Sequence, residues 1–309
     1  MGFSAAVGLY DELPRKDTFM SEPRTLTLDL PGAALRYDIR AAETESTEPV
    51  LLLIASPMGA GGFTTLAGHF RDRTVVTYDP RGVGRSQRAD GATWSTPEEH
   101  ADDLHRVISA LDAGPVDLFA SSGGAVNALV LVAQHSEQVR TLVAHEPPAA
   151  NVLPDREEAL AAVADISETY QRAGLGPGMA KFIALTGLKG PIPADFTELS
   201  PNPADFGLPT EDDGSRDDPL LGQHMTAVTH YEHDFEALRR ASTRIVIAAG
   251  AESKGEMTHR AALAIAEQLG TDAVIFPSHH GGFLGGEFGW TGEPAAFAAT
   301  LRDVLAGHR

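Results

Sequence analysis

The alternation of short apolar segments with helical patterns, from residue 25 onward, is the feature that most constrains the fold of this chain. Residues 25–30 and 34–40 alternate apolar and polar side chains around Pro31-Gly32, which predicts a β-hairpin. Strand-like and helix-like segments then follow in turn, and this order predicts a mostly parallel, eight-stranded sheet with helices on both faces. The other predicted strands are residues 50–54, 74–78, 116–119, 139–144, 244–249 and 273–276.

Residues 95–99, Ser-Thr-Pro-Glu-Glu, carry several signals that start a helix. They supply a capping hydroxyl, a proline in the first turn and acids at the positive end of the helix dipole. This helix is predicted to run to about Leu111, before Gly114-Pro115. Further helices are predicted near residues 63–70, 123–134, 258–269 and 294–306.

The β signals vanish between about residues 149 and 241. This stretch has a helical pattern over residues 156–173 and connections rich in Pro, Gly and Asp, which predicts a helical insertion between two core strands. We call residues 149–241 the cap segment and expect it to cover a site on the sheet. Residues 25–148 and 242–309 then form the core domain, and residues 1–24 form an N-terminal arm.

Composition narrows the class of protein. The net charge of −19 argues against binding of nucleic acid or of an anionic membrane surface, and no apolar run is long enough to span a bilayer. The chain has no cysteine, which excludes disulfides, thiolate metal sites and a cysteine nucleophile. We therefore expect a cytoplasmic protein that acts on a small-molecule substrate as a monomer or homodimer, with no nucleic-acid or membrane partner.

A Ser-Ser-Gly-Gly segment joins a predicted buried strand to a predicted buried helix. A serine held between a strand and a helix by small neighbours is typical of a nucleophile elbow, a strained turn that exposes the hydroxyl. The residues two before and two after the nucleophile must be small. Ser122 has Ala120 and Gly124 at these positions, whereas Ser121 would have Phe119. Ser122 is therefore the predicted nucleophile, and a plain tight turn or a phosphate-binding loop is the alternative.

Residues 79–86 read Asp-Pro-Arg-Gly-Val-Gly-Arg-Ser and directly follow a predicted strand. Together with the elbow, this motif makes residues 25–308 resemble the α/β-hydrolase superfamily, whose members carry D-x-R-G-x-G-x-S after the fourth strand and G-x-S-x-G after the fifth. The resemblance implies an α/β-hydrolase fold with a helical cap, and a structural role for Asp79 and Arg81. Ala120 replaces the first glycine of the elbow motif.

An oxyanion hole needs two backbone N–H donors aimed at the developing negative charge. The resemblance implies Gly123 as one donor and Ser56 as the other. Relatives carry His-Gly-x-Pro after the third strand, where this chain reads Ile-Ala-Ser-Pro at residues 54–57. Because Pro57 has no N–H to donate, Met58 is the alternative to Ser56.

A histidine must take the proton from the serine and pass it to the leaving group. In this superfamily it lies in the loop after the last strand, where residues 276–283 read Phe-Pro-Ser-His-His-Gly-Gly-Phe. His280, followed by small residues and an aromatic, is the predicted base, and His279 is the alternative. His230 and His233 have a spacing that could bind a metal, but no third ligand accompanies them, so we expect neither metal nor cofactor.

The third member of the triad is a carboxylate that accepts the imidazole N–H. Relatives place an Asp after the seventh strand in a G-x-x-D pattern, where this chain has Ser253. Some serine hydrolases of the superfamily instead carry the acid after the sixth strand, and Glu146 stands there, at the sheet edge where catalytic side chains collect. Glu146 is the predicted acid, and Glu252 is the alternative.

These residues predict a serine hydrolase that cleaves a carboxylic ester or lactone through an acyl-enzyme. A serine nucleophile argues against the epoxide-hydrolase and haloalkane-dehalogenase branches, whose nucleophile is a carboxylate. Cleavage of C–C bonds, acyl transfer, perhydrolysis and cyclisation remain open, because a fold does not settle a reaction. The absence of an aspartate at position 253 also leaves open a ligand-binding, receptor-like protein with little turnover.

Overall fold

The computed structural model describes residues 22–308, so nearly all of the arm predicted over residues 1–24 lies outside the described residues. Within them, one sheet has the strand order β1-β2-β4-β3-β6-β7-β8-β9, and a short ninth strand, β5, pairs with β2 outside this path. β1 and β2 form the predicted antiparallel hairpin, and β2 is antiparallel to β4 and β5 as well. All pairs from β4 to β9 are parallel. The strands are β1 Arg24–Leu30, β2 Ala33–Arg40, β3 Leu51–Ser56, β4 Val75–Tyr78, β5 Gln87–Arg88, β6 Val116–Ser122, β7 Val139–His145, β8 Arg244–Gly250 and β9 Val274–Phe276.

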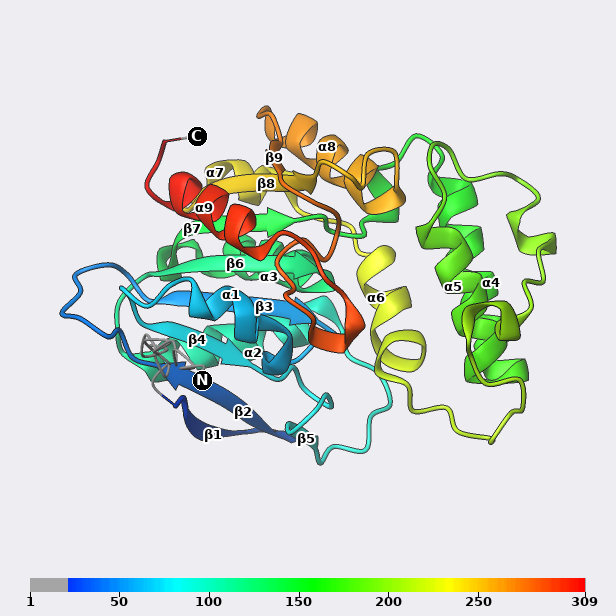
Figure 1. Cartoon of the computed structure of the whole chain (residues 1–309), viewed down its shortest axis with the longest axis horizontal. Coiled ribbons are helices and arrows are strands. Elements are labelled where there is room, and N and C mark those ends of the chain that lie inside the picture. The colour runs from blue at the N-terminus through cyan, green and yellow to red at the C-terminus, as the bar shows by residue number, and fades with distance from the viewer. Residues whose placement is uncertain (1–21, 309) are drawn as a thin grey trace, which may run out of the picture.

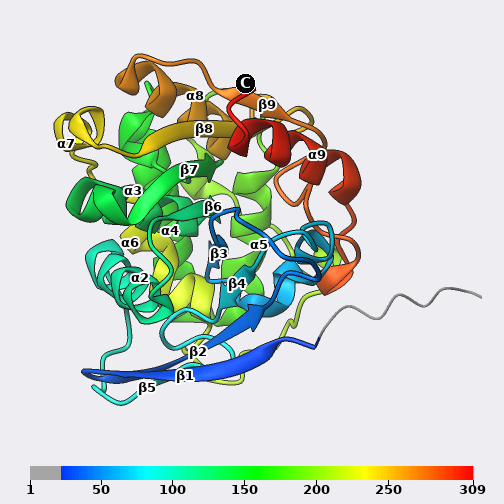
Figure 2. The same cartoon turned by 90° about the vertical axis from the view of Figure 1, so that its left-hand side faces the viewer.

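Helices cover both faces of the sheet, as Figure 2 shows almost edge-on. Successive side chains of a strand point to opposite faces, so each face has its own core. Leu52 and Ile54 belong to the core on the side of α2, α3 and α8, whereas Leu51 and Leu53 belong to the core on the side of α1 and α9. The helices of these two layers are α1 Thr64–Gly68, α2 Pro97–Leu111, α3 Gly123–His135, α8 Met257–Leu269 and α9 Pro294–Leu305.

Helix α2 begins where the sequence predicts. The side chain of Thr96 accepts a hydrogen bond from the backbone N–H of Glu99 at 3.1 Å, and Pro97 occupies the first turn. The helix ends at Leu111, and the left-handed backbone of the next residue, Asp112 (φ 48°), lets the chain leave the helical path. The capping signals therefore act as expected.

Helices α4, α5 and α6 of the cap segment lie beyond the ends of the strands, with α6 between the sheet and the α4–α5 pair (Figure 1), whereas α7 packs against α3 and α8. Helix α4, Arg156–Ala173, coincides with the predicted helical pattern. It is followed by α5 Leu175–Thr186, a π-helical turn over Pro219–His224, α6 Met225–Thr229 and α7 Phe235–Arg240. Buried residues of α4 and α6 join the core on the α2–α3 side, so part of the cap segment packs directly on the sheet domain. Among residues 22–308, none of the helices is both long and apolar enough to cross a membrane.

Candidate active site

Ser122 stands at the junction of β6 and α3 with a backbone conformation that few non-glycine residues adopt. Its φ is 56° and its ψ is −131°, a strained combination of the kind that clusters at active sites. Gly124 lets the helix approach the neighbouring strand, because a Cβ at this position would lie 2.6 Å from the Cα atom of Ala55. Ala120 is fully buried. These features are those expected of a nucleophile elbow.

The two residues predicted to supply oxyanion donors lie next to each other. Ser56 is the register partner of Ser122 in the parallel pair of β3 and β6. A Cβ on Gly123 would lie 2.7 Å from the carbonyl oxygen of Ser56, so the backbones of these two residues are close. Met58, the predicted alternative, follows the cis peptide between Ser56 and Pro57, and its side chain packs against the core on the α1–α9 side.

Glu146 and His280 form a hydrogen-bonded acid–base pair near the elbow. Glu146 follows β7 with a φ of 47°, is fully buried and accepts a hydrogen bond from the backbone N–H of Gly250 at 2.8 Å through Oε1. Its Oε2 lies 2.6 Å from Nδ1 of His280, which donates to it. The carboxylate therefore orients the imidazole through Nδ1, and the other ring nitrogen, Nε2, is left to exchange a proton with a reacting group.

The pKa values of this pair shift in the directions that strengthen it. Burial acts to raise the pKa of Glu146, but the hydrogen bond from His280 and the charges of His145 and His280 outweigh it and hold the pKa well below its usual value. Burial acts to lower the pKa of His280, but the hydrogen bond and negative charge of Glu146 raise it above 6.5. Glu146 is thus ionised at neutral pH and stabilises the imidazolium form of His280.

His279, the alternative base, makes its contacts within its own loop. Its Nε2 lies 3.2 Å from the carbonyl oxygen of Thr291, its Nδ1 accepts from the backbone N–H of Gly281, and its ring contacts Trp290. All of these contacts lie in the loop that follows β9. His279 therefore anchors this loop, while His280 meets the carboxylate.

Of the carboxylates that follow β8 among the described residues, none is hydrogen-bonded to His280 as Glu146 is. Glu252, the alternative acid, is exposed, and its side chain accepts a long hydrogen bond of 3.5 Å from Ser278. Ser253, at the position where relatives carry an aspartate, is fully buried, and its Oγ has no hydrogen-bond partner among the described residues. The structure thus brings Glu146 to His280 and keeps Glu252 apart from it.

Two buried histidines join the site beyond the predicted set. His145 precedes Glu146, lies 3.1 Å through Nδ1 from Oγ of Ser121 and stacks on His280 with ring centroids 5.9 Å apart. Burial lowers its pKa to about 4, so it is neutral at pH 7. His224, in the cap segment, lies 2.9 Å through Nδ1 from Oγ of Ser56. The residues around His224 form no motif that predicts its contact with Ser56, because this contact depends on how the cap segment packs.

The donor atoms of His145, Glu146 and His280 lie within 4.8 Å of one another. Within residues 22–308 this is the one trio of His, Asp and Glu side chains spaced closely enough to hold an ion, and it coincides with the acid–base pair. His230 and His233 do not belong to this group of side chains. The geometry of this trio fits a hydrogen-bonded acid–base pair with a neutral histidine packed beside it.

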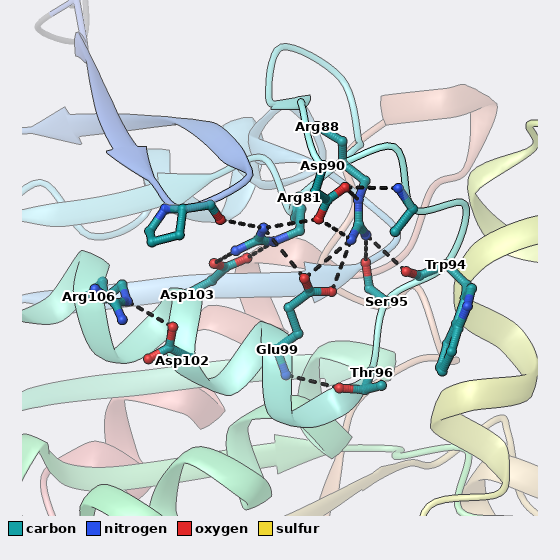
Figure 3. A network of polar contacts seen from close by, with 12 residues as sticks. Arg81, Arg88, Asp90, Trp94, Ser95, Thr96, Glu99, Asp102, Asp103 and Arg106 are labelled. Carbon is teal, nitrogen blue, oxygen red and sulfur yellow. Dashed lines mark hydrogen bonds and ion pairs between the residues drawn. The ribbon is translucent and has the colours of Figure 1, made fainter.

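The motif at residues 79–86 braces the loops around the site, as the resemblance implies. Asp79 accepts hydrogen bonds from the backbone N–H groups of Ala60 and Arg85 at 2.8 and 2.9 Å. Arg81 forms a buried ion pair with Asp103 of α2 (Figure 3). Neither side chain contacts the acid–base pair, so their role is to fix the loops on which the site depends.

The sequence matches a family model and a relative, and the fold is similar to that of solved structures. The family described as alpha/beta hydrolase fold matches residues 48–186. An uncharacterized hydrolase of Bacillus subtilis (strain 168), YraK, is 31% identical over 287 residues, which cover 90% of this chain and 95% of that protein.

Two solved structures illustrate the shared fold. A proline iminopeptidase of Mycobacterium smegmatis has a TM-score of 0.62 at 16% identity, with 92% of this chain and 98% of that chain covered. A thermophilic esterase of Thermogutta terrifontis has a TM-score of 0.61 at 20% identity, with 93% and 99% covered. At these identities the likeness concerns the fold alone. From the sequence likeness over nine-tenths of its length and from its fold, the chain belongs to the α/β-hydrolase family.

Proposed function

We propose that the chain is a serine hydrolase that cleaves a carboxylic ester or lactone of a small molecule through a covalent acyl-enzyme. The observation that carries the proposal is the 2.6 Å contact between Glu146 and His280 beside a serine whose backbone is strained at φ 56°. A buried carboxylate, an imidazole and an elbow serine are the groups that acyl transfer requires. Family membership supports hydrolysis as the reaction class.

In the proposed first step, Oγ of Ser122 attacks the carbonyl carbon, and Nε2 of His280 takes the hydroxyl proton. The carbonyl oxygen becomes an oxyanion that accepts hydrogen bonds from the backbone N–H groups of Gly123 and Ser56. The carbon–oxygen bond to the leaving group then breaks, and His280 protonates the departing alkoxide. Glu146 stabilises the imidazolium that exists between these proton transfers.

In the second step, a water molecule attacks the acyl carbon while His280 takes one of its protons. Collapse of the second oxyanion breaks the bond to Ser122, whose Oγ recovers its proton from His280. A lactone follows the same path, except that its leaving alcohol stays attached to the acyl group. The products are a carboxylic acid and an alcohol, or a hydroxy acid. This chemistry needs no group beyond the side chains and backbone named above.

Steady-state hydrolysis of p-nitrophenyl esters of increasing acyl length, and of five- and six-membered lactones, tests this proposal. The wild-type chain is expected to turn over at least one of these substrates. Ser122→Ala should lose about 10³-fold or more of kcat, because the nucleophile is gone. Ser121→Ala, the matched control one residue away, should stay within about threefold of the wild type. Equal loss in the control, or undiminished turnover in Ser122→Ala, would contradict the proposal.

A further inference from the structure

The cap segment makes a buried hydrogen bond to Ser56, the predicted second oxyanion donor; residues 56–58 are called the oxyanion loop below. His224 ends the π-helical turn Pro219–His224, is 1% exposed and places Nδ1 2.9 Å from Oγ of Ser56. Ser56 is the last residue of β3 and the register partner of Ser122. A side chain of the cap segment is therefore bonded to the residue whose backbone N–H is the proposed second oxyanion donor.

The ring of His224 also packs against the sheet domain. Its ring stacks on that of His100 in α2, with centroids 4.8 Å apart and an angle of 26° between the planes. The start of α2 is fixed in turn by the Arg81–Asp103 ion pair and by Arg88, which bonds to Ser95 and Glu99 (Figure 3). The imidazole of His224 thus has a rigid backing on one side and Ser56 on the other.

This arrangement leaves polar atoms buried without partners. Among the described residues, Nε2 of His224 and both ring nitrogens of His100 have no hydrogen-bond partner. Burial lowers the pKa of His224 to about 4, with a further contribution from the charge of Arg88, and burial with the charge of His224 places the pKa of His100 well below 6.5. Both rings are neutral at pH 7. Two apolar rings would fill the same space without stranding nitrogens, so the single bond to Ser56 is the feature that a histidine adds here.

The position of Ser56 matters for both proposed donors. The carbonyl oxygen of Ser56 lies so close to Gly123 that a Cβ there would approach it to 2.7 Å. A shift of Ser56 would therefore move its own N–H and disturb the backbone of Gly123 as well. Oxyanion donors act only when they are aimed in advance at the place where charge develops.

We propose that His224 is a positioning residue that holds Oγ of Ser56, and with it the oxyanion loop, in the arrangement that stabilises the transition state. The proposal rests on the serine-hydrolase function above. It ties the cap segment to catalysis, because the turn Pro219–His224 supplies the side chain that holds Ser56. His224 acts through Ser56 and contacts no reacting atom itself.

The test compares His224→Phe, His224→Asn and Ser56→Ala on an ester that the wild type hydrolyses. Phenylalanine keeps the stack on His100 but loses the bond to Ser56, so kcat should fall about tenfold or more while KM stays within about twofold. Asparagine places an amide near the position of Nδ1 and should recover most of kcat. Ser56→Ala keeps the backbone N–H but removes the hydroxyl, and should lose as much kcat as His224→Phe.

Two further measurements separate a positioning role from a merely structural one. The double variant Ser56→Ala with His224→Phe should lose no more kcat than either single variant, because both remove the same bond. The melting temperature of the double variant should stay close to that of the wild type, because both partners of the bond are removed together and neither is left buried without a partner. His233→Phe is the matched control, because Nε2 of His233 is also buried without a partner but the ring has no contact with Ser56; its kcat should not change.

Wild-type kcat in His224→Phe, a loss confined to KM, or additive losses in the double variant would overturn the positioning role. Labelling of the wild type by a fluorophosphonate distinguishes this failure from failure of the proposed function. If the wild type is labelled on Ser122 and His224→Phe is labelled at the same rate, the positioning role alone is wrong. If the wild type is not labelled, the serine-hydrolase proposal is wrong and the positioning role falls with it.

Discussion

The ends of two neighbouring strands, β7 and β8, differ sharply although both reach the same edge of the sheet. At the end of β7, Glu146 is fully buried and bonded to both His280 and the backbone of Gly250. At the end of β8, Ser253 is equally buried but its hydroxyl has no partner among the described residues, and Glu252 points to solvent. The resemblance to the family implies an acid on the second of these ends in most members, whereas the acid that we propose for this chain stands on the first.

If Glu146 is the acid, as we propose, residues from two neighbouring strand ends position it together. Neighbouring strands lie about 4.8 Å apart, so a longer side chain on one strand end can reach a histidine that an aspartate on the next would also reach. Glu146 Oε1 accepts from Gly250 at the end of β8, which aims the carboxylate across the gap between the two strands. The proposed acid thus stands on a different strand end from the one that the resemblance implies, yet it reaches the same histidine.

The largest expected effect comes from Glu146→Gln. The amide of glutamine would donate a hydrogen bond to Nδ1 of His280 and so favour the tautomer with its proton on Nε2, which cannot accept the proton of Ser122. Hydrolysis of a p-nitrophenyl ester should lose ~10³–10⁴-fold of kcat. Glu252→Gln is the matched control and should change kcat less than about twofold. Loss of activity in Glu252→Gln alone would place the acid on β8.

A smaller effect tests whether the two strand ends are interchangeable. Glu146→Ala should be nearly inactive, and adding Ser253→Asp to it should restore about tenfold or more of kcat, because the new carboxylate stands where relatives carry theirs. Ser253→Asp alone should lower the melting temperature, since it buries a second negative charge close to Glu146. Failure of the double variant to exceed Glu146→Ala, with both folded by circular dichroism, would show that the ends are not equivalent.

The pH dependence of kcat/KM follows from the same pair. His280 must be neutral to accept a proton, so activity falls as the pH drops through its pKa. Glu146 raises this pKa above 6.5, and burial alone would lower it. In Glu146→Gln the acidic limb of the profile should therefore move to lower pH, measured on the residual activity. An acidic limb that stays in place, or moves to higher pH, would show that the negative charge of Glu146 does not stabilise the imidazolium form of His280.

The smallest effect concerns the unpaired hydroxyl on β8. Ser253→Ala removes a buried group that has no partner among residues 22–308, and should raise the free energy of unfolding by about 1 kcal/mol in urea denaturation. Ser86→Ala is the matched control. Its buried hydroxyl donates to the carbonyl oxygen of Asp79 and accepts from the N–H of Arg36, so its removal should destabilise the fold. A loss of stability in both variants would mean that Ser253 has a partner after all.

The sheet could be predicted because its signals are local. The hairpin around Pro31-Gly32, the cap at Thr96 and the small neighbours of Ser122 each specify backbone geometry within a few residues. Several features escaped prediction, and two of them show why. Strand β5 has only two residues, Gln87–Arg88, which is too short for any periodicity, and the segment 175–178 (Leu-Gly-Pro-Gly) suggests a loop although it starts α5.

The candidate site also has a part that the sequence predicts and a part that depends on tertiary packing. The order of strands places Glu146 and the loop of His280 at one edge, so the sequence could bring them together as candidates. The contact of His224 with Ser56 spans 168 positions and depends on the packing of a π-helical turn, for which the sequence has no motif. The small residues of α5 also reflect tertiary contacts, since Gly178 packs against Tyr170 where a Cβ would come within 2.8 Å.

The most direct test of the account is the rate and place of labelling by a fluorophosphonate, followed by peptide mass spectrometry. The account predicts one phosphonyl group per chain, on Ser122, and the same rate in Glu252→Gln. In Glu146→Gln the rate should fall by ~10²-fold or more, because His280 no longer activates the serine. Labelling on Ser121, no labelling of the folded wild type, or an undiminished rate in Glu146→Gln would contradict the account.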